Sequence, residues 1–112
     1  MTMEDVADIG IQATVKEVSK VVGSESVYVS FDIDALDPAF APGTGTPEIG
    51  GMTSREALSL VRGISGLGLD VVGADVVEVS PPFDVGGITS LAGANILFEL
   101  LCIVTQSSKK AV

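Results

Sequence analysis

The stretch VYVSFDID, residues 27–34, decides the fold of this chain. Its first five residues are mostly apolar or β-branched, a composition that predicts a short buried strand. The strand ends abruptly in acidic residues, Asp32, Asp34 and Asp37. In open α/β sheets ligands bind beyond the carboxyl ends of the strands, so we expect the chemistry of this protein at that edge.

The other predicted elements follow from capping residues, glycines and prolines. They are a helix from Thr2 to about Lys20, a Gly- and Pro-rich loop over residues 38–51, a helix that begins at the capping pair Thr53 and Glu56 and ends at Gly63 or Gly66, a strand over residues 71–79, and a helix over residues 89–104. Strands that alternate with helices in this order predict an α/β fold with a parallel sheet. No internal repeat or domain boundary is evident, so residues 1–112 form one unit.

The length and the composition do not match those of an ordinary small domain. The 112 residues are 46% apolar, whereas a chain this short buries only a modest part of its surface when it folds alone. Elements that are buried on both faces, as in a parallel sheet covered by helices, have such a composition. We therefore expect a fragment of a larger fold or a subunit of an oligomer.

The net charge of −9, from 15 acidic and 6 basic residues, disfavours nucleic acid and anionic membranes as partners and favours cationic ligands. No signal-peptide pattern opens the chain, and no uninterrupted apolar stretch reaches the roughly 20 residues that a bilayer requires. The single cysteine, Cys102, cannot form an internal disulfide, which fits a reducing compartment or a buried thiol. We expect a soluble, cytoplasmic protein that binds neither nucleic acid nor membrane.

Asp32 and Asp34 are two positions apart, so their side chains point to the same side if the strand conformation continues through them. Two carboxylates so placed suit Mg²⁺, Mn²⁺ or Ca²⁺, and they repel each other without a cation. The alternative is that one or both only cap the following turn, since aspartate is common at turns. The sequence contains no histidine, so neither imidazole ligands nor a histidine-based triad can come from these residues.

The carboxylate of Glu78, at the end of the second apolar strand, is costly to desolvate without a cationic partner. That partner is either a cationic ligand or an arginine of the chain, Arg55 or Arg62. Asp75, three positions earlier, is interpreted as a structural hydrogen-bonding residue.

The string SFDIDALDPAFAPGTGTPE, residues 30–48, followed by GGMTSRE, residues 50–56, resembles the signature of the ureohydrolases, the agmatinase and arginase family. GADVVEVSPPFD, residues 73–84, and SLAGANILFELL, residues 90–101, are similar to the last strand and the final helix of that family. The Ala-Pro-Gly-Thr-Gly-Thr-Pro run is more similar to agmatinases than to arginases. The resemblance implies a three-layer, arginase-like α/β/α fold with a parallel sheet, of which residues 1–112 would be the C-terminal portion.

The same resemblance implies the metal-dependent hydrolysis of a guanidino compound, such as agmatine, to urea and an amine, as in polyamine metabolism. It also implies a binuclear Mn²⁺ site, which lowers the pKa of water and positions the resulting hydroxide. Asp32 would bridge both ions, Asp34 would bind one of them, Glu78 would pair with the substrate guanidinium, and Thr46 would line the substrate end of the site.

The family's other metal ligands, a histidine of a Gly-Gly-Asp-His type and an Asp-x-His-x-Asp cluster, belong to an N-terminal portion that these residues do not include. We therefore expect this chain to carry only part of the site, as a homo-oligomer or completed by a missing N-terminal portion. Two alternatives remain open. One is a non-catalytic remnant that folds or oligomerises for structural reasons, and the other is an Asp-x-Asp, Mg²⁺-dependent phosphoryl or glycosyl transferase.

Overall fold

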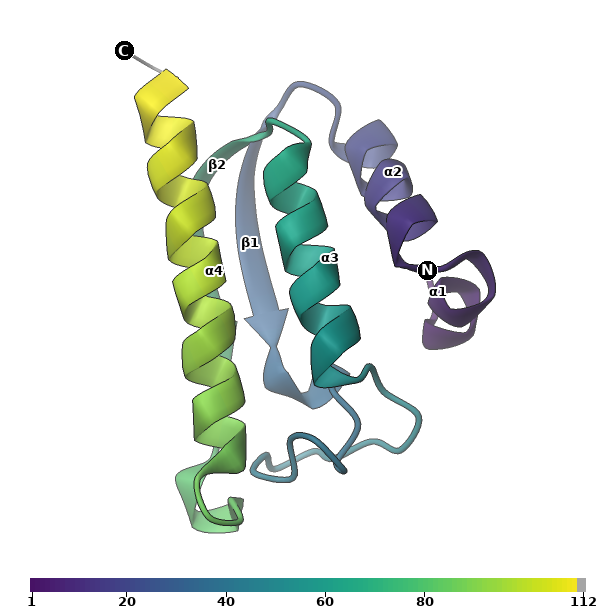
Figure 1. Ribbon diagram of the computed structural model, residues 1–112, viewed down its shortest axis with the longest axis vertical. Helices are drawn as coiled ribbons and strands as arrows, with labels where there is room; N and C mark the ends of the chain where they lie inside the picture. Colours follow the sequence, from purple (N-terminus) through teal and green to yellow (C-terminus); the bar gives the residue numbers. More distant parts are fainter. Residues whose placement is uncertain (111–112) are drawn as a thin grey trace.

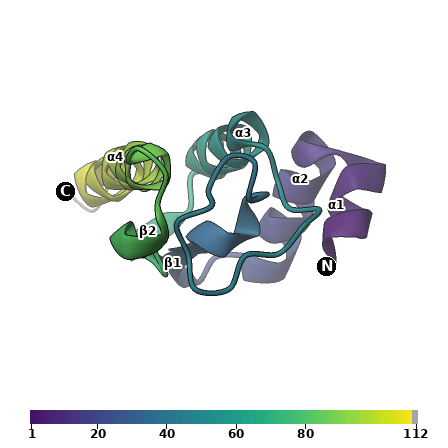
Figure 2. The same cartoon turned by 90° about the horizontal axis from the view of Figure 1, so that it is seen from below.

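Two parallel strands and one layer of helices make up the computed structural model, which describes residues 1–110 and the side chains of residues 1–107. Strand β1 (Ser26–Asp32) pairs with β2 (Asp70–Val77), and helix α3 (Ser54–Gly66) lies between them in the chain. The remaining helices are α1 (Met3–Ile9), α2 (Ile11–Val22) and α4 (Ile88–Lys110), with 3-10 turns η1 (Ile33–Ala35) and η2 (Pro81–Phe83) after the strands. Helices α2, α3 and α4 lie side by side over one face of the sheet (Figures 1 and 2).

The prediction of an α/β fold with a parallel sheet is confirmed. The capping box of Thr53 and Glu56 begins α3 as expected, and α3 ends at Gly66, the second of the two predicted stops. Helix α4 is longer than predicted and reaches Lys110. The described residues supply one helix layer and two strands of the three-layer fold.

The prediction of one continuous N-terminal helix is wrong. Thr2 and Asp5 form a capping box that begins α1, but the helix is interrupted at Gly10, where φ is +80°. Glycine adopts this left-handed backbone without steric cost, so the chain can turn there and begin α2 directly afterwards. Helix α1 buries no residue, whereas α2 buries Thr14 and Val15.

The core lies between the sheet and the helix layer. Side chains alternate along β1, so Val27, Val29 and Phe31 face the helices while Ser26, Tyr28 and Ser30 face away. The largest fully buried side chains all follow β1 in the chain and are Ile33, Leu36, Val61, Val71, Thr89, Ile96 and Leu100.

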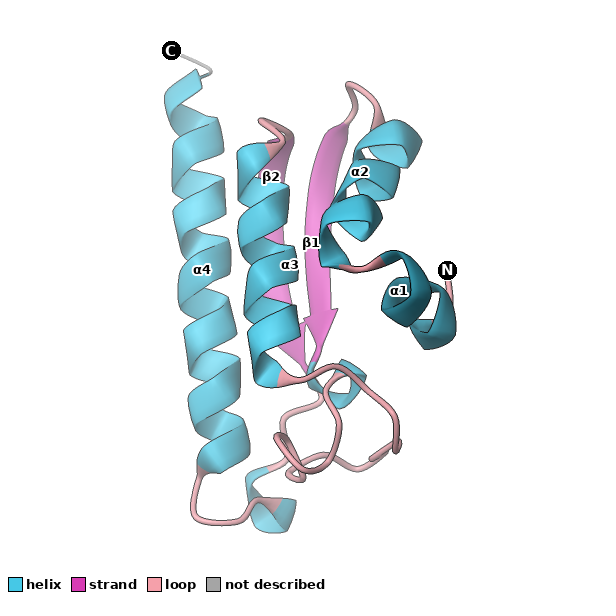
Figure 3. Cartoon of the chain, turned by 45° about the vertical axis from the view of Figure 1, so that its right-hand side comes forward, coloured by secondary structure: helices cyan, strands magenta, loops and turns pink. Residues whose placement is uncertain are grey.

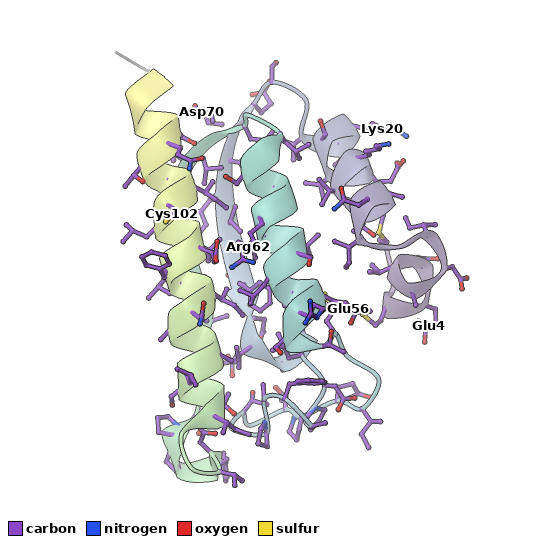
Figure 4. All side chains as sticks on the ribbon, viewed as in Figure 1. Glu4, Lys20, Glu56, Arg62, Asp70 and Cys102 are labelled. Atoms are coloured by element: carbon purple, nitrogen blue, oxygen red, sulfur yellow. The ribbon has the colours of Figure 1, made fainter. Side chains whose placement is uncertain are left out.

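The other face of the sheet is open and polar. The Asp75 carboxylate accepts hydrogen bonds from the hydroxyls of Tyr28 (2.9 Å) and Ser30 (2.7 Å). Asp70, at the end of the sheet far from the loop (Figure 4), accepts one from the Ser26 hydroxyl at 2.6 Å. These bonds join β1 to β2 across the open face, and the interpretation of Asp75 as a structural residue is confirmed.

Helix α4 is apolar on both of its faces. One face packs on β2 and α3 through Ile96, Leu100 and Ile103, while Leu91, Phe98 and Leu101 are exposed. Its stretch Ile88–Ser107 has a mean hydropathy of 1.8, so by length and composition alone this helix could cross a membrane. A helix with one face in a core and one apolar face uncovered has the same composition, and the absence of a membrane partner stays a prediction.

The packing of α3 on α2 depends on Gly63, and we expect Gly63→Ala to destabilise the protein. An added Cβ would lie 2.5 Å from Val15 Cγ2, a β-branched side chain that is buried and has little freedom to move. Such overpacking costs about 1–3 kcal/mol, which exceeds the gain in helix propensity of about 1 kcal/mol.

Gly66→Ala in the same helix is the matched control, because an added Cβ there meets nothing within 4 Å. It should leave the free energy of urea unfolding unchanged or increase it. Equal stability of the two variants would contradict a close approach of α2 and α3 at Gly63.

Candidate metal and guanidinium site

The candidate site lies beyond the carboxyl ends of both strands, where loop 38–52 folds back under the sheet (Figure 3). Asp32 is the last residue of β1, and Asp34 lies in the 3-10 turn that follows. The Asp34 N–H donates a hydrogen bond of 3.1 Å to Asp32 Oδ1. Asp32 therefore caps the turn, as the alternative interpretation expected, and this bond occupies only one of its carboxylate oxygens.

Thr46, in the middle of loop 38–52, is hydrogen-bonded to one member of this pair. Its Oγ1 donates a hydrogen bond of 2.8 Å to Asp34 Oδ2. Asp34, Thr46 and Glu48 line an open hollow of about 680 Å³ between the loop and α1. The structure thus brings together three of the four residues singled out in the sequence, Asp32, Asp34 and Thr46.

The electrostatics of the pair are unfavourable for two bare carboxylates. Desolvation, the neighbouring Asp34 carboxyl and the charge of Glu78 raise the pKa of Asp32 above its ordinary value. The hydrogen bond from the Asp34 N–H offsets these effects only in part. Repulsion of this kind is what a bound cation relieves, so the donor set fits a divalent cation with oxygen ligands such as Mn²⁺ or Mg²⁺.

Glu78 is held in a strained conformation directly after β2. Its φ is +66°, the one left-handed backbone among the described residues other than glycine, and its side chain is exposed. Such conformations cost roughly 1–2 kcal/mol in an ordinary residue and persist where the surrounding structure imposes them. The carboxylate is close enough to Asp32 for its charge to affect the pKa there.

The alternative that Arg62 neutralises Glu78 is wrong. Arg62 lies between α3 and α4 (Figure 4) and pairs with Glu99 at 2.6 Å. No ion pair joins Glu78 to Arg55 or to any other cation whose side chain is described. The carboxylate is therefore free to bind a cationic ligand.

The described side chains do not form a complete metal centre by themselves. Over residues 1–107, no three carboxylate, imidazole or thiolate side chains converge as they would to hold an ion. Asp32 and Asp34 would supply two of the ligands for a cation, and the others would have to come from elsewhere.

Sequence reasoning missed the residues that hold the loop in place. Thr89 accepts a hydrogen bond of 2.8 Å from the Gly43 N–H, and Asp84 accepts bonds from the backbone of Thr89 and Ser90, both at 3.0 Å. An Asp shortly before an apolar helix was the available signal for the capping role of Asp84. Gly43 and Thr89 are 46 positions apart, so no local sequence pattern indicates that they are hydrogen-bonded.

Comparisons with known proteins converge on one family. Residues 1–102 match the arginase family. The chain is 62% identical to guanidinopropionase of Pseudomonas aeruginosa over 97% of its own length and 34% of that protein. Among solved structures it resembles proclavaminate amidino hydrolase from Streptomyces clavuligerus (TM-score 0.90, 47% identity, 96% of this chain and 35% of that one). It also resembles a hypothetical agmatinase from Burkholderia thailandensis (TM-score 0.89, 45% identity, 96% and 34%).

The chain thus spans about a third of the length of the relatives it matches. The prediction that this third is the C-terminal one stays a prediction.

We expect Glu78→Gly to stabilise the protein relative to Glu78→Ala by about 1 kcal/mol, because glycine adopts a positive φ without strain. Both variants lack the carboxylate, so the difference in their free energy of unfolding isolates the backbone term. Denaturant unfolding of the two variants measures it. An alanine variant as stable as the glycine variant would contradict a strained backbone at Glu78.

Proposed function

Because the chain belongs to the arginase family, we propose that it carries part of the active site of an enzyme that hydrolyses a guanidino compound to urea and an amine. The observation that carries this proposal is that hydrogen bonds join Asp32, Asp34 and Thr46 beyond the end of β1. Glu78, at the end of β2, is close enough for its charge to raise the pKa of Asp32. The names of the relatives, guanidinopropionase, agmatinase and proclavaminate amidino hydrolase, support a guanidino substrate.

Asp32 and Asp34 are proposed as ligands of Mn²⁺. The hydrogen bond from Thr46 fixes one oxygen of Asp34, so that the carboxylate is oriented before a metal arrives. A cation bound there would supply one piece of chemistry, the acidification of a water molecule that attacks the guanidinium carbon. Ligands beyond these two would come from a portion outside residues 1–112 or from another copy of the chain.

Glu78 is proposed to bind the substrate guanidinium. A carboxylate and a guanidinium form short, charge-assisted hydrogen bonds with matching geometry. The exposed Glu78 carboxylate has no cationic partner among the described side chains. The backbone strain at this residue supports a functional role, since strained conformations are concentrated at binding and catalytic sites.

The partners of the protein follow from this proposal. A cationic guanidino compound fits a site whose nearest charged side chains are carboxylates and a chain whose net charge is −9. The open polar face of the sheet and the exposed apolar face of α4 support completion by an N-terminal portion or by oligomerisation. A cytoplasmic location remains part of the proposal.

We expect Mn²⁺ to stabilise the wild-type chain and to leave Asp32→Asn unaffected. A ligand that binds only the folded state stabilises it by about 2.7 kcal/mol at a concentration of 100 times Kd. Because the folded-state pKa of Asp32 is raised, the ionised carboxylate costs stability above that pKa, and the cost disappears as the pH falls below it. Metal-free Asp32→Asn should therefore be at least as stable as wild type at pH 7.

Thermal unfolding with and without Mn²⁺ measures both effects. Asp8→Asn, on the exposed side of α1, is the matched control and should respond to Mn²⁺ as wild type does. Equal stabilisation of wild type and Asp32→Asn by Mn²⁺ would show that the metal binds elsewhere. No stabilisation of either would favour the non-catalytic remnant.

Residues 1–112 alone should release no urea from agmatine, 3-guanidinopropionate or 4-guanidinobutyrate in the presence of Mn²⁺. Two carboxylate ligands rarely hold a catalytic pair of ions, and the described residues offer no third ligand at the site. A colorimetric urea assay on the pure chain measures this. Sustained turnover would refute the partial site, because the chain would then complete the metal centre by itself or by self-association.

A further inference from the structure

Loop 38–52 is closed at its base by the chain segment that carries Asp34. The Asp37 carboxylate accepts hydrogen bonds from the N–H groups of Ala39 (2.8 Å) and Gly50 (2.9 Å). The Met52 N–H donates to the Ala35 carbonyl at 2.8 Å, and Met52 accepts a bond from the Asp37 N–H at 2.9 Å. These contacts fix where the loop leaves and returns, but they lie several residues away from Thr46.

A second anchor holds the far part of the loop, and both backbone groups of Gly43 take part in it. The Gly43 N–H donates to Thr89 Oγ1 at 2.8 Å, and the Gly43 carbonyl accepts from the Ser80 N–H at 2.8 Å. A Cβ at position 43 would lie 2.8 Å from Asp84 Cβ, so the loop packs directly on the segment before α4. Thr89 is fully buried, so a water molecule cannot take the place of the Gly43 N–H as the partner of its hydroxyl.

Asp84 in turn holds the backbone of Thr89 in place through hydrogen bonds to its carboxylate. Its Oδ1 accepts from the Thr89 N–H at 3.0 Å, and its Oδ2 accepts from the Ser90 N–H at 3.0 Å and from the Ser90 hydroxyl at 3.1 Å. Desolvation alone would raise the pKa of Asp84, but these bonds outweigh it and hold that pKa well below its ordinary value. The carboxylate therefore stays ionised and keeps the first turn of α4 in place.

We propose that Thr89 is a positioning residue for the candidate site: its hydroxyl, set by Asp84, holds Gly43 so that Thr46, three residues later, donates to Asp34. This inference rests on the proposed function, since it assigns Thr89 to the orientation of a proposed metal ligand. The same anchor bonds Ser80, two residues after Glu78, to the loop. Gly43 thus links the loop that carries Thr46 to Thr89 through its N–H and to the segment that carries Glu78 through its carbonyl.

The test compares Thr89→Val with Thr89→Ser in the chain of residues 1–112. Valine keeps the shape of threonine but removes the acceptor, which leaves the Gly43 N–H buried and unpaired, whereas serine keeps the hydroxyl. Ser107→Ala is the matched control. The Ser107 hydroxyl bonds to Val71 N–H, Leu69 O and Ile103 O at the opposite end of α4, so its loss weakens the docking of the same helix far from the loop.

Two readouts separate positioning from simple stability. The first is the χ1 rotamer of Thr46 from three-bond NMR couplings, which we expect to be single in wild type, Thr89→Ser and Ser107→Ala and averaged in Thr89→Val. The second is the Mn²⁺ affinity by calorimetry, which we expect to fall about tenfold in Thr89→Val, the effect of losing one buried hydrogen bond, and to be restored in Thr89→Ser.

An unchanged Thr46 rotamer in Thr89→Val would overturn the proposal, whatever the metal affinity. An equal loss of Mn²⁺ affinity in Ser107→Ala would also overturn it, because the effect would then follow global stability. Absence of Mn²⁺ binding in wild type would refute the proposed metal site, and the Thr46 rotamer would still decide whether Thr89 positions the loop.

Discussion

The parallel pairing of β1 with β2 is the constraint on which the rest of the structure depends. Its register places Asp32 opposite Val77, so the last residue of one strand lies beside the residue that precedes Glu78. On the open face the bonds from Tyr28 and Ser30 to Asp75 fix this register, while Phe31 and Val76 fix it from the core side. A slip by one residue would exchange the two faces and separate the acidic strand ends.

The loop beyond the strands adds a second constraint, which is steric. Gly51 approaches the backbone so closely that a Cβ would lie 2.7 Å from the Ala35 carbonyl oxygen, and a Cβ at Gly43 would lie 2.8 Å from Asp84 Cβ. The loop thus has little room to move at either anchor. A loop fixed in this way can present a hydroxyl to a carboxylate without loss of conformational entropy when a ligand binds, which is how binding sites are preorganised.

Local patterns predicted the elements of this fold, whereas contacts between distant residues set the details of the site. The capping box at Thr53, the apolar run before Asp32 and the alternation of helices and strands were sufficient for the parallel α/β fold. The break at Gly10 was missed because glycine is tolerated within helices as well as at their ends. The positive φ of Glu78 and the bond from Gly43 to Thr89 belong to contacts between segments far apart in the sequence, so no local spacing could predict them.

The proposed partial site and the uncovered surfaces of the described residues have the same physical origin. Additional protein would bury the open face of the sheet and, on the helix side, the exposed apolar side chains Leu91, Phe98 and Leu101 of α4, and it would offer further ligands to the two carboxylates beyond β1. Desolvation, together with the neighbouring carboxylates of Asp34 and Glu78, raises the pKa of Asp32, so its charge lacks a compensating cation among the described residues. Since the charge can be balanced by a cation, and the apolar surface only by more protein, metal binding and completion of the fold should favour each other.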